Sequence, residues 1–165
     1  MIIAIIYLIV SFLLDGIVSN YLPFELSNPS YFKTIYTIIS LTIMYNYFSN
    51  KKKYLIILII LGILFDVVYT STLLVNTVIF ITIYILFTKI DYLMTTNIIT
   101  INIKSIICIF IYHILTYIIL LLSHFNNYNL KLLLIIMLRS IIMTIIYTTI
   151  SYLIINKIYL DKKIK

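Results

Sequence analysis

Residues 54–88 read YLIILIILGILFDVVYTSTLLVNTVIFITIYILFT, two apolar runs divided by the polar stretch Thr70-Ser71-Thr72. A helix needs about 20 mostly apolar residues to cross the roughly 30 Å of hydrocarbon in a bilayer. This region is too long for one crossing, and its polar residues fall in the middle. The pattern therefore predicts two transmembrane helices, at 54–69 and 73–88, with a hinge at the Ser/Thr cluster.

Further apolar runs flank this pair, so we predict an all-α membrane protein with six transmembrane helices. The other four runs cover residues 2–19, 31–48, 103–122 and 132–155. No repeat period or linker is evident, and residues 1–165 are predicted to form a single integral membrane domain. A cleaved signal peptide is not expected, because no basic segment precedes the first run and Asp15 interrupts it.

The composition excludes most other classes of protein. Apolar residues make up 64% of the chain and charged residues 10%, with a mean hydropathy of +1.18. Soluble domains carry about 25% charged residues, and a small one could not bury this much apolar surface. Disordered chains are poor in apolar residues. The net charge is +7, but the basic residues lie between the apolar runs and form no basic face. This distribution argues against binding of nucleic acid.

The basic residues predict the orientation, because Lys and Arg collect in cytoplasmic loops. With six crossings, Lys33 and Lys131 fall on one side and Arg139 falls inside the last run, whereas the other side receives Lys51, Lys52, Lys53, Lys89, Lys104, Lys157, Lys162, Lys163 and Lys165. We therefore expect both termini in the cytoplasm. A five-crossing alternative that fuses 54–88 into one helix would place the C-terminal lysines opposite Lys51–Lys53, and it is disfavoured.

Three ionisable residues inside the runs predict an intramembrane charge cluster. Each costs about 2.5–3.5 kcal/mol to insert, so each calls for a partner or a purpose. A rise of about 1.5 Å per residue puts Asp66 and Arg139 at the same depth, roughly 12 Å below the outer boundary, and Asp15 near that level. We expect Arg139 to pair with Asp66, with Asp15 as a second acidic partner. Orienting the helices is the favoured role, and a proton or ion relay is the alternative.

The sequence predicts no catalytic, cofactor or metal site. Cys108 is the only cysteine, His113 has no ligand at helical spacing, and no motif of a hydrolase or a phosphate loop is present. A different feature marks the last run, where small polar residues recur at spacings of four, four and three. These residues share one helix face and predict a helix–helix seam: Ser140, Thr144, Thr148 and Ser151.

Residues 61–76, LGILFDVVYTSTLLVN, resemble the central signature of the rod shape-determining protein MreD family. The matching features are a glycine four residues before an aspartate, a small polar turn and an asparagine, here Gly62, Asp66 and Asn76. Leu74 stands where many members have glycine, which predicts a looser hairpin. The start FLLDGIVSNYL at 12–22 and the proline-bearing segment before the second run are also similar to this family.

This resemblance implies a non-catalytic scaffold of the bacterial elongation machinery, located in the plasma membrane and supporting cell shape and peptidoglycan synthesis. It implies binding to MreC, a single-span membrane protein, and indirect links to RodA, a class B penicillin-binding protein and MreB filaments. The MreD fold is similar to the substrate-binding subunits of energy-coupling-factor vitamin transporters, so such a subunit is the alternative. Those subunits tend to carry alanine-rich contact motifs and tryptophans, whereas this chain has one alanine, Ala4, and no tryptophan.

Overall fold

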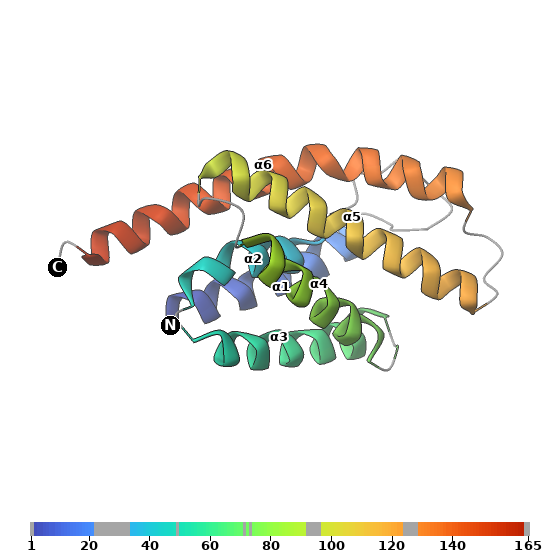
Figure 1. Ribbon diagram of the computed structural model, residues 1–165, viewed down its shortest axis with the longest axis horizontal. Helices are drawn as coiled ribbons and strands as arrows, with labels where there is room; N and C mark the ends of the chain where they lie inside the picture. Colours follow the sequence, from blue (N-terminus) through green and yellow to red (C-terminus); the bar gives the residue numbers. More distant parts are fainter. Residues whose placement is uncertain are drawn as a thin grey trace.

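All regular structure in the part of the chain that is described is helical (Figure 1). The computed structural model describes residues 2–21, 34–48, 50–70, 72, 74–91, 97–123 and 129–163. A 3₁₀ turn, η1, follows the second helix at Tyr45–Tyr47, and a π-helical segment, η2, follows the third at Asp66–Thr70. The α-helices are α1 Ile2–Tyr21, α2 Tyr36–Met44, α3 Lys51–Phe65, α4 Val75–Asp91, α5 Ile98–Leu122 and α6 Leu130–Lys163.

Three of these helices are long and apolar enough to cross a membrane. They are the continuous segment Lys51–Thr70 with 20 residues, Ile98–Leu122 with 25, and Leu130–Ile158 with 29. Apolar helices of shorter length cover Ile3–Val18 and Val75–Lys89. Within the described residues, the all-helical prediction and the hinge between the third and fourth helices are confirmed, and the helices are compatible with an all-α membrane protein.

The helix α2 differs from the membrane-length helix predicted at 31–48. It has nine residues, which rise only about 14 Å, and residues 31–33 lie outside the described part. All side chains from Thr37 to Met44 are buried. Figure 1 shows α2 in the middle of the molecule, with α3 on one side of it, α5 and α6 on the other, and α4 overlapping it in this view. Because protein encloses α2, the thickness of the bilayer does not set its length.

Two polar segments that lie outside the predicted helices contain helix starts. The Asn50 side chain accepts hydrogen bonds from the amides of Lys52 and Lys53, so α3 starts three residues before the predicted position. Asn97 and Thr100 form a reciprocal capping box, which starts α5 at residue 98 instead of 103. Such caps satisfy the amides that the first turn of a helix leaves without a partner.

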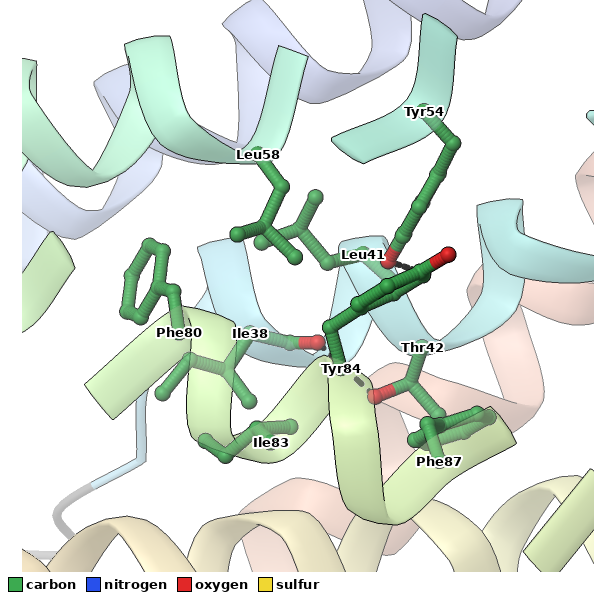
Figure 2. A pocket seen from close by; sticks show the side chains of 9 residues that line it. All are labelled: Ile38, Leu41, Thr42, Tyr54, Leu58, Phe80, Ile83, Tyr84 and Phe87. Atoms are coloured by element: carbon green, nitrogen blue, oxygen red, sulfur yellow. Dashed lines mark hydrogen bonds between the residues drawn. The ribbon is translucent and has the colours of Figure 1, made fainter. Parts of the chain in front are cut away.

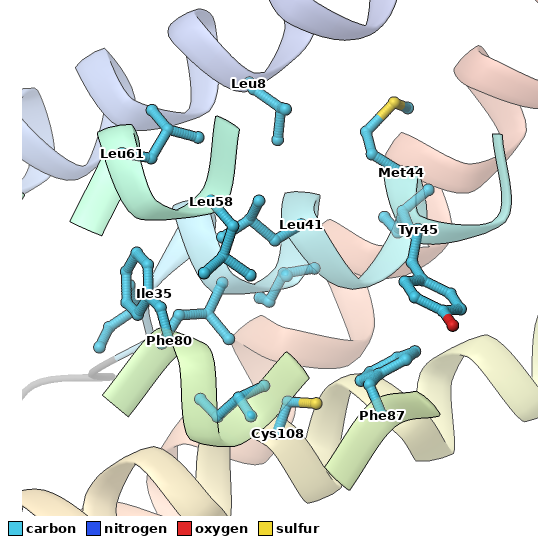
Figure 3. Close-up of a cluster of buried hydrophobic side chains, with 14 of the residues drawn as sticks. Leu8, Ile35, Leu41, Met44, Tyr45, Leu58, Leu61, Phe80, Phe87 and Cys108 are labelled. Carbon is cyan, nitrogen blue, oxygen red and sulfur yellow. The ribbon is translucent and has the colours of Figure 1, made fainter. Parts of the chain in front are cut away.

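The core forms where α2 meets helices from both sides (Figure 3). Leu8 of α1, Leu41 of α2, Leu58 of α3, Phe80 of α4 and Cys108 of α5 are all buried in this cluster. Cys108 packs as a small apolar side chain. The core therefore encloses the short α2 among buried side chains of the other helices.

Two lysines that we assigned to the cytoplasmic side lie against aromatic rings. Lys51 Nζ donates a 2.6 Å hydrogen bond to the carbonyl of Tyr45 and lies 3.5 Å from the centroid of that ring. Lys104 is 1% exposed, with Nζ 5.8 Å from the ring centroid of Phe87. Because α5 begins at residue 98 and not at the predicted residue 103, Lys104 lies in the second turn of that helix and not in its first.

Candidate functional site

The Asp66 carboxylate lies between α3 and α4 and is 2% exposed. Its Oδ1 accepts hydrogen bonds from the backbone amide of Asn76 at 2.8 Å, the Asn76 side chain at 3.0 Å and the Thr72 hydroxyl at 2.8 Å. Its Oδ2 accepts from the Thr77 amide at 3.0 Å and the Thr77 hydroxyl at 2.9 Å. The two amides belong to the first turn of α4, where a negative charge is favourable. Asp66 therefore caps α4 from the preceding helix.

Asn76 extends this site to a third helix. Its Nδ2 donates to the hydroxyl of Thr70 at 3.0 Å as well as to Asp66. Its Oδ1 accepts a 2.8 Å hydrogen bond from the Tyr112 hydroxyl of α5. Asn76 is 3% exposed, so these bonds satisfy an amide group that water does not reach. The network joins α3, α4 and α5.

Asp15 of α1 makes the same arrangement with α2. Its Oδ1 accepts from the Tyr36 amide at 2.8 Å, and its Oδ2 accepts from the amide and the hydroxyl of Thr37 at 2.8 and 2.5 Å. The residue before α2 is Ile35, whose side chain has no oxygen to cap the helix. Asp15 supplies this cap from the neighbouring helix, and its carboxylate is 8% exposed.

The two helix pairs α1–α2 and α3–α4 therefore repeat one device. In each, one carboxylate oxygen binds an amide, and the other binds the next amide together with a threonine hydroxyl. The sequence signal is short, IYTII at 35–39 and VNTVI at 75–79. The aspartates precede the threonines by 22 and 11 residues, so a search for a fixed repeat period does not reveal it.

Both glycines lie at close helix approaches near these carboxylates. A Cβ atom on Gly62 would lie 2.7 Å from the Thr77 Cα, so α3 and α4 could not keep their present spacing. A Cβ atom on Gly16 would lie 2.6 Å from the Tyr69 hydroxyl, which donates to the carbonyl of Phe12 at 2.6 Å. The first contact is with backbone and the second with a side-chain end. Gly62 is therefore the stricter requirement, and it holds Asp66 close to the start of α4.

Leu74, just before α4, has a φ of 62°, in the left-handed region that favours glycine. Leu74 therefore has a backbone conformation that glycine adopts more readily than leucine. The left-handed region costs a residue with a Cβ atom about 1–2 kcal/mol. The Leu74 side chain is 55% exposed, so it offsets little of this strain through packing.

We expect Leu74→Gly to raise the free energy of unfolding by about 1 kcal/mol, after the added entropy of the unfolded glycine is subtracted. Thermal unfolding of the purified protein in detergent micelles measures this change. Leu74→Ala is the matched control, because it removes the same exposed side chain but keeps the Cβ atom. It should give no such gain. A lower stability of Leu74→Gly than of Leu74→Ala would contradict the strain at this turn.

The structure does not form the predicted ion pair between Arg139 and the two aspartates. Asp15 and Asp66 take their hydrogen bonds from helix amides and threonines. Arg139 Nη1 is buried and has no hydrogen-bond partner among the residues that the structure describes. The rise along a helix gives the level of a residue but not the direction in which its side chain points. The amides of the next helix lie nearer to each carboxylate in the chain.

The stripe of small polar residues on α6 faces the interior. The Thr144 hydroxyl of this stripe forms a 2.9 Å hydrogen bond with the hydroxyl of Thr34, which lies two residues before α2. Exposure is 0% for the first three of its four members and 4% for the last: Ser140, Thr144, Thr148 and Ser151. Small side chains allow the backbones of α6 and its neighbours to approach closely.

A hydroxyl cluster joins the same face of α6 to α1 and α2. The Tyr147 hydroxyl lies 3.0 Å from Ser11 Oγ, 3.2 Å from Ser40 Oγ and 3.4 Å from the Tyr7 hydroxyl. Ser40 also donates to Ser11 at 2.5 Å. Sequence reasoning did not select these residues, because single serines and tyrosines carry no recognisable spacing. The cluster connects helices with polar contacts in an otherwise apolar interior.

A small cavity lies between α2, α3 and α4 (Figure 2). Its free volume of about 10 Å³ leaves room for one water-sized molecule at most. The Tyr54 hydroxyl, which lines it, donates to the Leu41 carbonyl at 2.9 Å. The remaining lining is mostly apolar: Ile38, Thr42, Leu58, Phe80, Ile83, Tyr84 and Phe87. This cavity could not hold a vitamin-sized ligand.

Within the described ranges, no three His, Cys, Asp or Glu side chains lie close enough to hold a metal ion. The two buried aspartates are engaged in capping, so the site is one of helix–helix connection. Comparisons of the chain with protein-family models, curated proteins and solved structures find no match.

Proposed function

We propose that this protein is an MreD-like scaffold, a non-catalytic membrane component of the bacterial elongation machinery. The observation that carries the proposal is the role of the motif residues in the hairpin. Asp66 binds Asn76, Gly62 allows the close approach of Thr77, and Leu74 takes the conformation of glycine. The residues that resemble the family signature therefore act together in one structural unit. The polar side chains of this unit bind one another and not a substrate, which suits a scaffold better than an enzyme.

The proposed topology has six crossings in the bacterial plasma membrane, with both termini in the cytoplasm. Its support is the uneven distribution of lysines, which collect on one side of the apolar runs. In this topology α2 crosses inside a shell of other helices and needs no membrane-length apolar surface. The long α6 extends away from the other helices at its C-terminal end in Figure 1, and this end of the helix includes Lys157, Lys162 and Lys163.

The proposed direct partner is a single-span MreC-like protein, with RodA, a class B penicillin-binding protein and MreB filaments as indirect partners. The test is to purify the full chain after co-expression with the MreC-like protein of the same genome. We expect a stable complex. The free energy of unfolding of this chain should increase by about 2.7 kcal/mol when the partner concentration is a hundred times the Kd.

An unrelated single-span protein, expressed at the same level, serves as the control. If neither protein binds and native mass spectrometry finds a retained vitamin-sized molecule, the scaffold proposal is wrong and the transporter-subunit alternative is favoured.

A further inference from the structure

Arg139 is a charged side chain of α6 that the described chain does not neutralise. Its Nη1 is buried and has no hydrogen-bond partner there, while the residue as a whole is partly exposed. A guanidinium remains protonated in proteins and offers five donors. A cation inside a membrane helix pairs with an anion or lines an aqueous path. Arg139 therefore requires an anion that the described helices do not supply.

The acidic residues of the described helices are placed elsewhere. Asp15 and Asp66 are committed to the starts of α2 and α4. Asp91 closes α4 at the end away from Asp66. Asp161 follows Arg139 on the same helix by 22 residues, or about 33 Å. The anion for Arg139 therefore comes from outside these helices.

The surface beside Arg139 suits a helix of another protein. Leu134, Leu138 and Ile142 recur at intervals of four along α6 and are 51%, 65% and 54% exposed. They form an apolar strip, and Arg139 lies at its edge. Arg139 follows the start of α6 by nine residues, about 13 Å along the helix, which is deeper than the headgroup phosphates of a bilayer. A carboxylate on a transmembrane helix reaches this depth and can approach the part of Arg139 that is exposed, whereas the buried Nη1 is not accessible from outside.

We infer that Arg139 and this strip form the docking surface for a partner transmembrane helix that carries a carboxylate at the same depth. The inference rests on the proposed scaffold function, because it names the surface through which such a scaffold holds a single-span partner. Charge complementarity selects the partner, and the apolar strip provides packing on either side of the ion pair.

The first experiment measures the melting temperature of the isolated full chain in detergent. We expect Arg139→Leu to leave it unchanged or to raise it, because the change removes a charge whose buried Nη1 has no hydrogen-bond partner among the described residues. The rival is an internal pair with Glu25, which lies outside the described residues. Equal decreases in melting temperature for Arg139→Leu and Glu25→Gln would establish that pair and overturn the inference.

The second experiment uses a labelled leucine-based transmembrane peptide with one glutamate about 13 Å from its outer end, and a matched peptide with glutamine there. Energy transfer to the labelled full chain in phosphatidylcholine vesicles reports association. We expect the wild type to bind the glutamate peptide about tenfold more tightly, and Arg139→Gln to lose this preference. Equal binding of the two peptides, or a preference that persists in Arg139→Gln, would overturn the inference.

Co-purification with the MreC-like protein separates this inference from the proposed function. If wild type and Arg139→Gln retain that partner equally, the scaffold function stands and the docking surface is wrong. If only the wild type retains it, both are supported. If the wild type does not retain it, the proposed function fails, and with it the inference that rests on it.

Discussion

Replacing Asp66 with alanine is expected to lower the free energy of unfolding by about 4 kcal/mol, the largest effect of any single substitution considered for this chain. The carboxylate accepts five hydrogen bonds, including two from backbone amides of α4. Alanine leaves these donors buried without an acceptor, and water cannot replace it at a site that is 2% exposed. Thermal unfolding in detergent micelles measures the loss.

Two threonines of α4 provide a matched control for this prediction. The Thr77 hydroxyl donates to Asp66, whereas the Thr82 hydroxyl donates to the carbonyl of Val78 in its own helix. Thr77→Val should lower stability by about 2 kcal/mol, because a hydrogen bond to a charged group is lost. Thr82→Val should have little effect. Equal losses for the two valine variants would show that the Asp66 site contributes nothing beyond ordinary helix stability.

Replacing Asp15 with alanine is expected to lower the free energy of unfolding by about 3 kcal/mol and to loosen the start of α2. Three hydrogen bonds are lost, two of them from backbone amides. The effect is large because α2 is short and lies at the centre of the core. Hydrogen exchange should show faster exchange of the Tyr36 and Thr37 amides.

The second capping site is the internal control for that measurement. In Asp15→Ala, the Asn76 and Thr77 amides should keep their protection, because Asp66 still accepts their hydrogen bonds. In Asp66→Ala the pattern should reverse. If either substitution deprotects both pairs of amides equally, the two capping sites do not act as separate devices.

The long helices could be predicted from the sequence, because burial in a bilayer demands a minimum length of apolar chain. The hinge after Thr70 followed from the same argument, since a region twice the required length has to turn where its polar residues lie. The starts of α3 and α5 were placed too late, because Asn50 and Asn97 read as loop residues although they cap helices. A capping side chain is polar for a local reason that hydropathy does not measure.

The candidate site was partly visible in the sequence. Asp15 and Asp66 were selected correctly as buried acids that need compensation, but Arg139 was the wrong partner for both. Charge and depth suggested an ion pair across helices, whereas the structure compensates each carboxylate with the amides of the next helix. Unpaired amides are present at every helix start and leave no mark in a sequence, so only the fold shows which of them a carboxylate reaches.

The sequence by itself determined the environment of this protein and the approximate helices within it. The reason is that transfer of apolar side chains from water depends on composition and run length, which are properties of the linear chain. The tertiary structure alone decided that α2 is short and enclosed, that two aspartates repeat one capping device, and that Leu74 takes a left-handed turn. These features depend on the direction in which side chains point and on contacts between distant residues. The same geometry leaves Arg139 Nη1 buried with no hydrogen-bond partner among the described residues.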